Sequence, residues 1–312
     1  MTARTQPAER LLATFAGGGE ASVDATIDVR RAVSDAEYQR YKAAERRLRA
    51  ASINSPYVSL QHDAGEALSA AEDAVSGLVS RKIAPPAGIR TTNRAFQAFL
   101  SGFRAFADQT ASVVSKSFGR LEHEAFKAVF SEVYDANFAY RLTWALRNIA
   151  QHHTVVINWM RQHLREDRPP VADIGVDLSL LLEEGAEAKA SIRTEMTSAR
   201  APVSVTSLIE AVMHGCEFVQ ASLLVRHEAE LGADLAVLRG YRDESRASGG
   251  LPLAFIKTAN LETAHGTINA EWVRHDAAAV LEQALPACRV VVDRGAPHVA
   301  PDDLYVDLAL HN

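Results

Sequence analysis

The sequence is poor in cysteine and lacks a long apolar run. Cys216 and Cys288 are the only cysteines among 312 residues, which is too few for a disulfide framework and typical of a protein kept in a reducing compartment. No run of about 18 apolar residues is present to span a membrane. The first residues carry Glu9 and only the short apolar run 11–15, which is too weak for a secretory signal. We therefore expect a soluble, cytoplasmic protein without a membrane segment.

Basic residues are outnumbered by acidic ones. The chain has 33 Lys and Arg against 39 Asp and Glu, a formal charge of −6. This balance argues against a broad basic surface for long nucleic acid, although a local basic cleft remains compatible with it. A dinucleotide fingerprint, a phosphate loop and a nucleophile elbow are also missing from the sequence. We therefore expect no cofactor. We also expect no metal at His152, His153 and His163, because the adjacent His152 and His153 point about 100° apart on a helix and no carboxylate follows these two at i+4.

Apolar residues make up 47% of the chain, and their spacing predicts a mainly α protein. Ser34, with Glu37 three residues later, predicts the start of a first helix. The further helices are expected at 59–79, from Thr91 to Gly119, at 121–165, at 178–199 and at 204–246. The tail is expected to hold strands at 253–257 and 288–293 around a short helix at 275–285, with 305–310 as a further candidate strand.

Composition shifts divide the chain into three predicted parts. Residues 1–88 form an N-terminal helical region with a flexible leader up to residue 25, and Pro85–Gly88 mark its end. Residues 89–247 form a helical bundle. Residues 248–312 form a small mixed α/β tail. The predicted fold is thus a helical bundle with extra N-terminal helices and a mixed tail.

One stretch, Tyr140 to His153, concentrates polar side chains within a predicted helix. Each helical residue advances about 100°. With Arg147 at zero, Gln151 lies at about 40°, Asn148 at about 100° and His152 at about 140°. His153 falls near 240°, outside that arc. The first four residues therefore share one helix face.

Two apolar stripes run along the same predicted helix. One lies on the face of the polar residues and comprises Phe126, Val129, Phe130, Val133, Tyr140 and Trp144; the other comprises Phe138, Leu142, Leu146, Ile149, Val156 and Met160. A helix that is apolar on both faces is buried on both, so the polar motif is predicted to continue a buried or interface stripe. Burying an arginine is costly unless it is paired. Two explanations stay open: an internal hydrogen-bond network, or a cleft where Arg147 meets an anion.

Arg147-Asn148 and His152 resemble the signature of the HEPN superfamily of helical RNases and RNase-derived modules. In that family a long helix carries an arginine, then four to six residues, then a histidine, often with Asn, Asp or His directly after the arginine. His153 also satisfies the spacing. The resemblance covers roughly residues 90–247 and implies a helical bundle. It also implies a metal-independent endoribonuclease whose site forms where the motif helices of two protomers meet.

The residue types suit that chemistry. RNA cleavage without metal needs a group that titrates near neutral pH to move the 2′-hydroxyl or leaving-group proton, which is the property of histidine. It also needs a fixed cation on the phosphate, for which arginine offers a bidentate fork. We assign His152 as acid–base group, Arg147 as phosphate clamp, Asn148 as the residue that orients them and His153 as an auxiliary.

The expected partners are RNA and a second copy of the chain, with an antitoxin or regulatory protein as a further candidate. A toxin-like or antiviral-defence role follows by family analogy alone. Some family toxins carry a tyrosine two residues after the motif histidine, where this chain has Thr154 or Val155, so neutralisation by modification of that tyrosine is not expected. The alternative function is a catalytically inactive helical module that binds a protein partner or a nucleotide.

Overall fold

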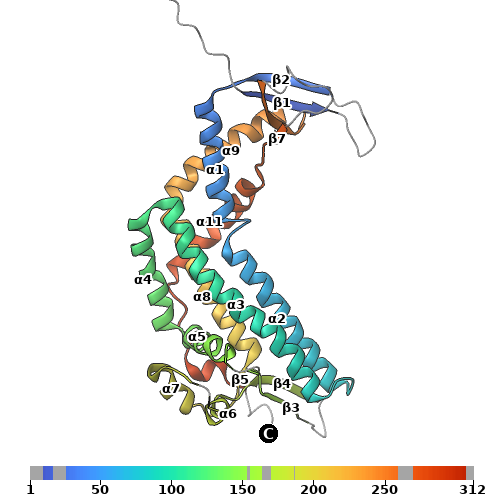
Figure 1. Cartoon of the computed structure of the whole chain (residues 1–312), viewed down its shortest axis with the longest axis vertical. Coiled ribbons are helices and arrows are strands. Elements are labelled where there is room, and N and C mark those ends of the chain that lie inside the picture. Colours follow the sequence, from blue (N-terminus) through green and yellow to red (C-terminus); the bar gives the residue numbers. More distant parts are fainter. Residues whose placement is uncertain are drawn as a thin grey trace, which may run out of the picture. The chain divides into compact units, whose positions relative to one another are not determined.

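The computed structural model describes residues 10–16, 26–152, 155–163, 170–185, 187–258 and 270–306. It is mainly helical with two small antiparallel sheets, which confirms the mainly α prediction (Figure 1). The chain forms two compact, discontinuous units: unit 1 is Met1–Ile53 with Arg226–Pro286, and unit 2 is Asn54–Val225 with Ala287–Asn312. This division differs from the predicted parts 1–88, 89–247 and 248–312, because segments distant in sequence pack together.

Unit 1 combines a sheet with helices α1, Asp35–Ala51, and α9, Glu228–Ala247. Its strands are β1 (Arg10–Ala16), β2 (Thr26–Val33), β6 (Leu253–Lys257) and β7 (Ala270–Trp272), in the order β2-β1-β6-β7. The Ser34 hydroxyl accepts a hydrogen bond from the amide of Glu37, which confirms the predicted helix start. The strand predicted at 253–257 is also confirmed. The expectation of a leader without structure is wrong for residues 10–16, because β1 pairs with β6 from far along the chain.

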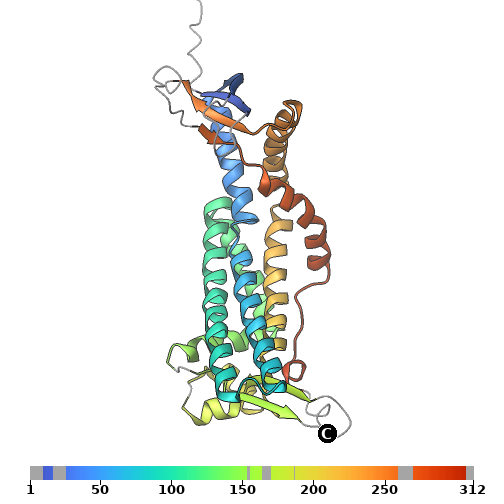
Figure 2. The same cartoon turned by 90° about the vertical axis from the view of Figure 1, so that its right-hand side faces the viewer.

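Three long helices build unit 2, and Figure 2 shows them alongside one another. They are α2 (Pro56–Val79), α3 (Pro85–Phe118) and α8 (Val205–Arg226). The helix predicted from Thr91 begins earlier, because Pro85–Gly88 form the first turn of α3. Proline suits the first turn of a helix because its missing N–H has no partner to lose. Gly119, with φ of 102°, ends α3 as predicted.

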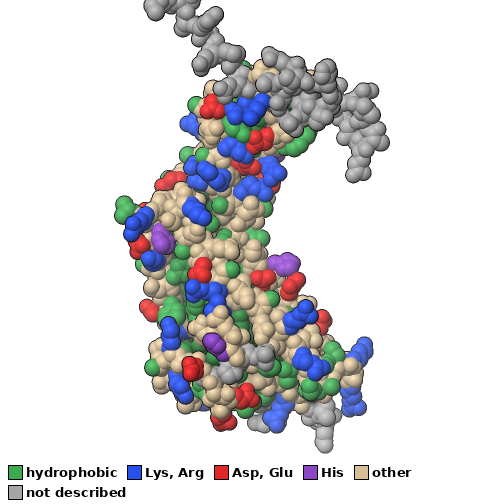
Figure 3. All heavy atoms as spheres, viewed as in Figure 1, with side chains coloured by type: hydrophobic (Ala, Val, Ile, Leu, Met, Phe, Trp, Pro, Cys, Tyr) green, Lys and Arg blue, Asp and Glu red, His purple; other side chains and the backbone are tan. Residues whose placement is uncertain are grey.

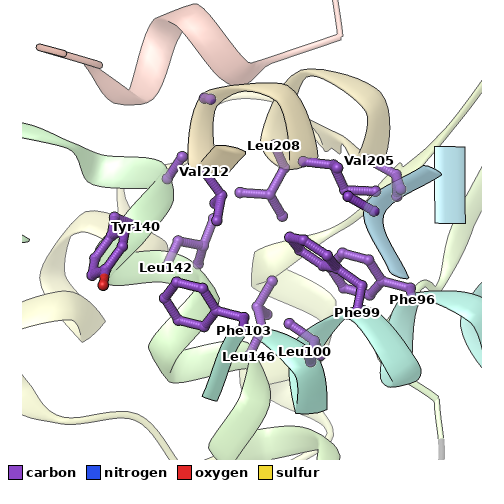
Figure 4. Packing of buried hydrophobic residues seen from close by; sticks show 14 of the residues in the cluster. Phe96, Phe99, Leu100, Phe103, Tyr140, Leu142, Leu146, Val205, Leu208 and Val212 are labelled. Carbon is purple, nitrogen blue, oxygen red and sulfur yellow. The ribbon is translucent and has the colours of Figure 1, made fainter. Parts of the chain in front are cut away.

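The core of unit 2 lies between α3, α5 (Phe138–Ala150) and α8, where Phe96, Phe99 and Phe103 face Val205, Leu208 and Val212 (Figure 4). All six side chains are 0% exposed. Among the described helices, α8 alone is long and apolar enough to cross a membrane, and 67% of its apolar window is buried inside the protein. It is therefore a core helix of unit 2.

The remaining elements correct several predictions. They are α4 (Arg120–Ala136), β3 (Trp159–His163), β4 (Val171–Val176), α6 (Leu178–Glu183), α7 (Ala190–Thr197), β5 (Val203–Ser204), α11 (Asp276–Asp293) and the 3₁₀ turn η1 (Pro301–Leu304). The helices predicted at 121–165, 178–199 and 204–246 are each interrupted, and 159–163 is a strand. Residues 288–293 lie in α11 and are not a strand. Tyr305 makes one bridge to Val203, and 307–310 lie outside the described residues.

Candidate functional site

Asn137 divides the predicted motif helix into α4 and α5. Its backbone is extended, with φ of −116° and ψ of 107°. Its buried side chain caps α5 by accepting from the amide of Tyr140 at 3.0 Å, and its Nδ2 donates to the carbonyl of Ala211 on α8 at 3.0 Å. Beside this joint a Cβ on Gly215 would lie 2.9 Å from Val133 Cγ1, so glycine permits the close approach of α8. These contacts fix where α5 begins.

The motif occupies the C-terminal end of α5. Arg147 and Asn148 lie in the last turn, and the helix ends at Ala150. His152 follows in a turn, where its amide donates to the carbonyl of Ile149 at 2.9 Å. The continuous helix through His152 is therefore wrong. His153, the predicted auxiliary residue, lies outside the described residues.

Side-chain amides hold the Arg147 guanidinium. Its Nη1 donates to Gln151 Oε1 at 2.6 Å and to Asn148 Oδ1 at 3.3 Å. Both acceptors are neutral, and within the described part of the chain no ion pair joins Arg147 to a carboxylate. The positive charge is thus positioned without being neutralised by an acid. The nearby carboxylates Glu132 and Asp135 of α4 form no such pair.

The motif is more exposed in the single chain than the sequence predicted. Arg147 is half-buried, whereas Asn148, Gln151 and His152 are exposed. The buried-stripe prediction holds upstream, where Tyr140 is 1% exposed. At the motif the two sides of α5 differ: Leu146 and Ile149 stay buried, at 0% and 1% exposed, whereas Asn148 on the other side is exposed to solvent. Arg147, Asn148 and His152 are thus brought to one solvent-facing helix end.

Asn93 of α3 fixes the chain just after the motif. Its Oδ1 accepts from the amides of Val156 at 2.8 Å and Ile157 at 3.1 Å. All three residues are buried, and Val156 and Ile157 are 0% exposed. The Asn93 side chain thus binds the backbone to α3 a few residues after His152. The turn that carries the histidine is therefore anchored on both sides.

A cavity of about 130 Å³ adjoins the motif. Its lining includes Arg141, Trp144 and Asn148 from α5, together with Lys189 at the start of α7. Arg141 Nη2 donates to Glu195 Oε1 at 2.8 Å, so its charge is satisfied within the protein. Lys189 is exposed at the start of α7. Asn148 is the motif residue that reaches this cavity. The site thus combines a positioned guanidinium, an exposed imidazole and an aromatic neighbour.

The sequence placed Trp144 on the motif face as part of an apolar stripe, but it missed Lys189 as a member of this surface. Trp144 carried a signal, because it precedes Arg147 by three residues and Asn148 by four, the spacing of neighbours on one helix face. Lys189 carried none, since α7 reaches the site only through the tertiary fold. None of the protein-family models matches the chain, and the comparisons with curated proteins and with solved structures also found no match.

Proposed function

We propose that the protein is a metal-independent endoribonuclease of the HEPN type. The observation that carries the proposal is the exposed end of α5, where amide oxygens position the Arg147 guanidinium and His152 follows within the next turn. A surface arginine held by carboxylates would be a structural ion pair. An arginine held by amides retains its charge for an external anion.

The chemistry follows from the residue types. Neutral His152 takes the proton of a ribose 2′-hydroxyl, whose oxygen attacks the adjacent phosphorus, and the bond from phosphorus to the 5′-oxygen breaks as that oxygen receives a proton from the His152 imidazolium. The products carry a 2′,3′-cyclic phosphate and a 5′-hydroxyl. Both described bonds of Arg147 use Nη1. Nε and Nη2 are therefore the donors that would meet the phosphate oxygens as negative charge develops, with Asn148 as the orienting residue and His153 as auxiliary.

Exposure of the motif supports a composite site. Two copies that bring their α5 ends together would enclose the arginine and histidine and exclude water, which strengthens electrostatic stabilisation. The homodimer, a toxin-like or antiviral-defence role, a neutralising or regulatory protein and a cytoplasmic location all belong to this proposal. A monomer at micromolar concentration that still cleaves RNA would contradict the composite site.

A second candidate is a catalytically inactive module that binds a protein partner or a nucleotide through the same face. The cavity beside Asn148 and Trp144 favours it, because such a cavity offers binding without requiring proton transfer. The two functions differ in what His152 does. In the enzyme it moves a proton, whereas in the module its replacement by a similarly sized polar side chain is tolerated.

Cleavage of end-labelled RNA in EDTA tests the proposal. The wild type is compared with Arg147→Ala/His152→Ala and with a matched control, His62→Ala/Arg94→Ala, which removes an exposed histidine and an exposed arginine from α2 and α3. We expect the wild type and the control to cut and the motif variant to be inactive. No cutting by any folded protein would favour the binding module. Equal cutting by all three would contradict the site.

A further inference from the structure

A larger cavity, of about 450 Å³, lies between α3, α4 and α5 of unit 2. This volume is within the range of small-molecule pockets. Four of its lining residues are aromatic: Phe130 and Tyr134 from α4, and Tyr140 and Trp144 from α5. Ala107 and Ala111 of α3 leave room opposite them. The cavity therefore has the flat apolar walls that suit a planar ring.

Tyr140 supplies a buried polar group to this cavity. The side chain is 1% exposed and lies at the margin of the core cluster in Figure 4. Its hydroxyl has no well-formed hydrogen bond among the described residues, although the Trp144 indole lies beside it. Burial raises the pKa of this hydroxyl well above its ordinary value, so it remains a donor at neutral pH. A bound molecule with a polar ring edge would give the hydroxyl a partner, which burial makes favourable.

Two basic side chains beside the cavity already have acidic partners. Arg104 donates to Asp108 at 2.8 Å, and its guanidinium carbon lies 4.7 Å from the centre of the Trp144 ring. The chain's own cation thus already occupies a cation–π position on this tryptophan. Lys127 also lines the cavity and pairs with Glu124 at 3.0 Å. On the face of the protein that is drawn in Figure 3, basic and acidic side chains are interspersed.

A neutral planar ring with hydrogen-bonding groups matches these features. The aromatic side chains offer stacking surfaces, and the carboxylate of Asp135 on the rim accepts from N–H groups. A nucleobase has both a planar face and such an edge. Bases that are unstacked from a strand are commonly bound by aromatic side chains in this manner.

Trp144 connects this cavity to the motif. It lines both the larger cavity and the smaller one that Asn148 reaches. Arg147 and Asn148 follow it by three and four residues on the same helix, so their Cβ atoms are about 5–6 Å from that of Trp144. A nucleotide whose base lies against Trp144 would thus place its sugar and phosphate toward the arginine end of α5.

We propose that the aromatic cavity formed by Phe130, Tyr134, Tyr140 and Trp144 binds an unpaired nucleobase. The assignment of that base to an RNA strand rests on the proposed endoribonuclease function; a free nucleoside offers the same ring. For an RNA substrate the cavity selects single-stranded regions, because a base held in a duplex cannot enter it. The cavity is then a base-binding subsite beside the cleavage motif.

Binding by two probes tests the subsite without requiring cleavage. The probes are a fluorescein-labelled single-stranded 2′-O-methyl oligonucleotide, which has no free 2′-hydroxyl to react, and adenosine. The protein variants are Trp144→Leu, which removes the stacking ring, and Ala111→Trp, which fills the cavity while keeping its walls. Trp159→Leu is the matched control, since Trp159 is half-buried in β3 outside the cavity lining. Anisotropy reports the oligonucleotide and calorimetry reports adenosine.

We expect Trp144→Leu and Ala111→Trp to weaken binding about 5- to 150-fold, the range for loss of one stacked base, and the control to bind as the wild type. Weakening of both probes, or of the oligonucleotide alone, supports a base from RNA. Weakening of adenosine alone, with no oligonucleotide binding, supports a free nucleoside. Unchanged binding by a folded Ala111→Trp protein, or no binding of either probe to the wild type, overturns the subsite.

Failure of this inference is distinguishable from failure of the proposed function. If Ala111→Trp leaves oligonucleotide binding and RNA cleavage unchanged, the endoribonuclease stands and the base pocket is wrong. If the wild type never cleaves RNA yet the two variants weaken probe binding, the pocket stands and the enzyme is wrong. If Trp144→Leu does not fold, Ala111→Trp decides alone.

Discussion

Both units have a buried apolar core, but they differ in the ion pairs that join their separate elements. In unit 1 charged side chains join separate elements: Arg31 bonds both Glu37 and Glu244, and Arg47 makes a two-pronged contact with Asp234. In unit 2 a large apolar cluster does this work. Among its described residues one ion pair, Arg141–Glu195, joins two elements, and the others lie within single helices.

The difference predicts different responses of the two units to their surroundings. Apolar burial does not depend on protonation or on the screening of charges, whereas partly exposed ion pairs depend on both. When apolar contacts join the elements of a unit, a charged residue at its surface can remain without an acidic partner. Unit 2 carries the motif, and Arg147 there is bound by amides.

Phe103→Ala tests the apolar core of unit 2 and has the largest expected effect. Phe103 is 0% exposed and its ring packs edge-on against Tyr140 and Trp144. Removing a buried phenylalanine costs about 3–5 kcal/mol. Urea unfolding followed by tryptophan fluorescence in a Trp272→Phe background, where both remaining tryptophans lie in unit 2, measures it. Leu121→Ala, at a residue 86% exposed, is the control. A loss below about 1 kcal/mol would contradict the description of the core.

Asn93→Ala tests a buried polar contact inside unit 2. The substitution removes the acceptor of two buried amides, those of Val156 and Ile157. Leaving a buried donor unsatisfied costs about 1–3 kcal/mol. The same unfolding experiment measures the loss, and hydrogen exchange of the Val156 and Ile157 amides should rise with it. Exchange that is unchanged would show that Asn93 does not anchor the chain after the motif.

Asp234→Ala tests the ion pair between Arg47 and Asp234, which joins α1 to α9 in unit 1. The Asp234 side chain is 7% exposed and that of Arg47 is 32% exposed, so solvent partly screens the arginine that is left behind. We expect a loss of about 1–3 kcal/mol, below the roughly 3–5 kcal/mol of a fully buried pair. Fluorescence of Trp272 in a Trp144→Phe/Trp159→Phe background reports unit 1. Asp28→Ala, which breaks an exposed pair with Arg30, should change little. Equal effects of the two substitutions would contradict this account.

The smallest expected effect is the acid sensitivity of unit 1. A hydrogen bond from Arg31 lowers the pKa of Glu37, with a further contribution from Tyr241. The folded protein thus keeps this carboxylate ionised where the unfolded chain, with a pKa of about 4.3, begins to bind a proton. Its contribution to stability is present above that pH and is lost as pH falls through the lowered value.

Glu37→Gln should therefore flatten the fall in unit 1 stability below about pH 4.3. Denaturant midpoints from the Trp272 reporter, taken across that range for wild type and variant, measure the change. The unit 2 reporter provides the internal control. A variant whose stability falls with acid as steeply as that of the wild type would remove Glu37 from the acid response.

Local sequence signals predicted much of the helical fold. The Ser34 cap predicted the start of α1, and Gly119 predicted the end of α3. The break at Asn137 was missed because its side chain satisfies a helix cap and a carbonyl on α8, which only the tertiary fold supplies. The β-branched run 290–292 suggested a strand, yet it lies in α11. Context there overrides local β propensity.

The candidate site was predicted in part. The sequence placed Arg147 and Asn148 side by side, and their hydrogen bond agrees with that. It also predicted that the motif continues a buried or interface stripe; in the single chain Asn148 and His152 are exposed, which is compatible with the interface alternative and not with burial inside the chain. The aromatic cavity was not foreseen: Phe130 and Trp144 share one stripe in a continuous helix, and the bend at Asn137 places them around a common space.

The chemistry of the cleaved RNA ends tests the central claim most directly. RNA is incubated with wild type or His152→Ala in EDTA, and the 3′ termini are identified by their resistance to phosphatase before and after acid opening of a cyclic phosphate. The account predicts 2′,3′-cyclic phosphate ends from the wild type and a rate at least about 100-fold lower for the variant. Ends bearing a 3′-hydroxyl, a requirement for divalent metal, or equal rates for both proteins would contradict it.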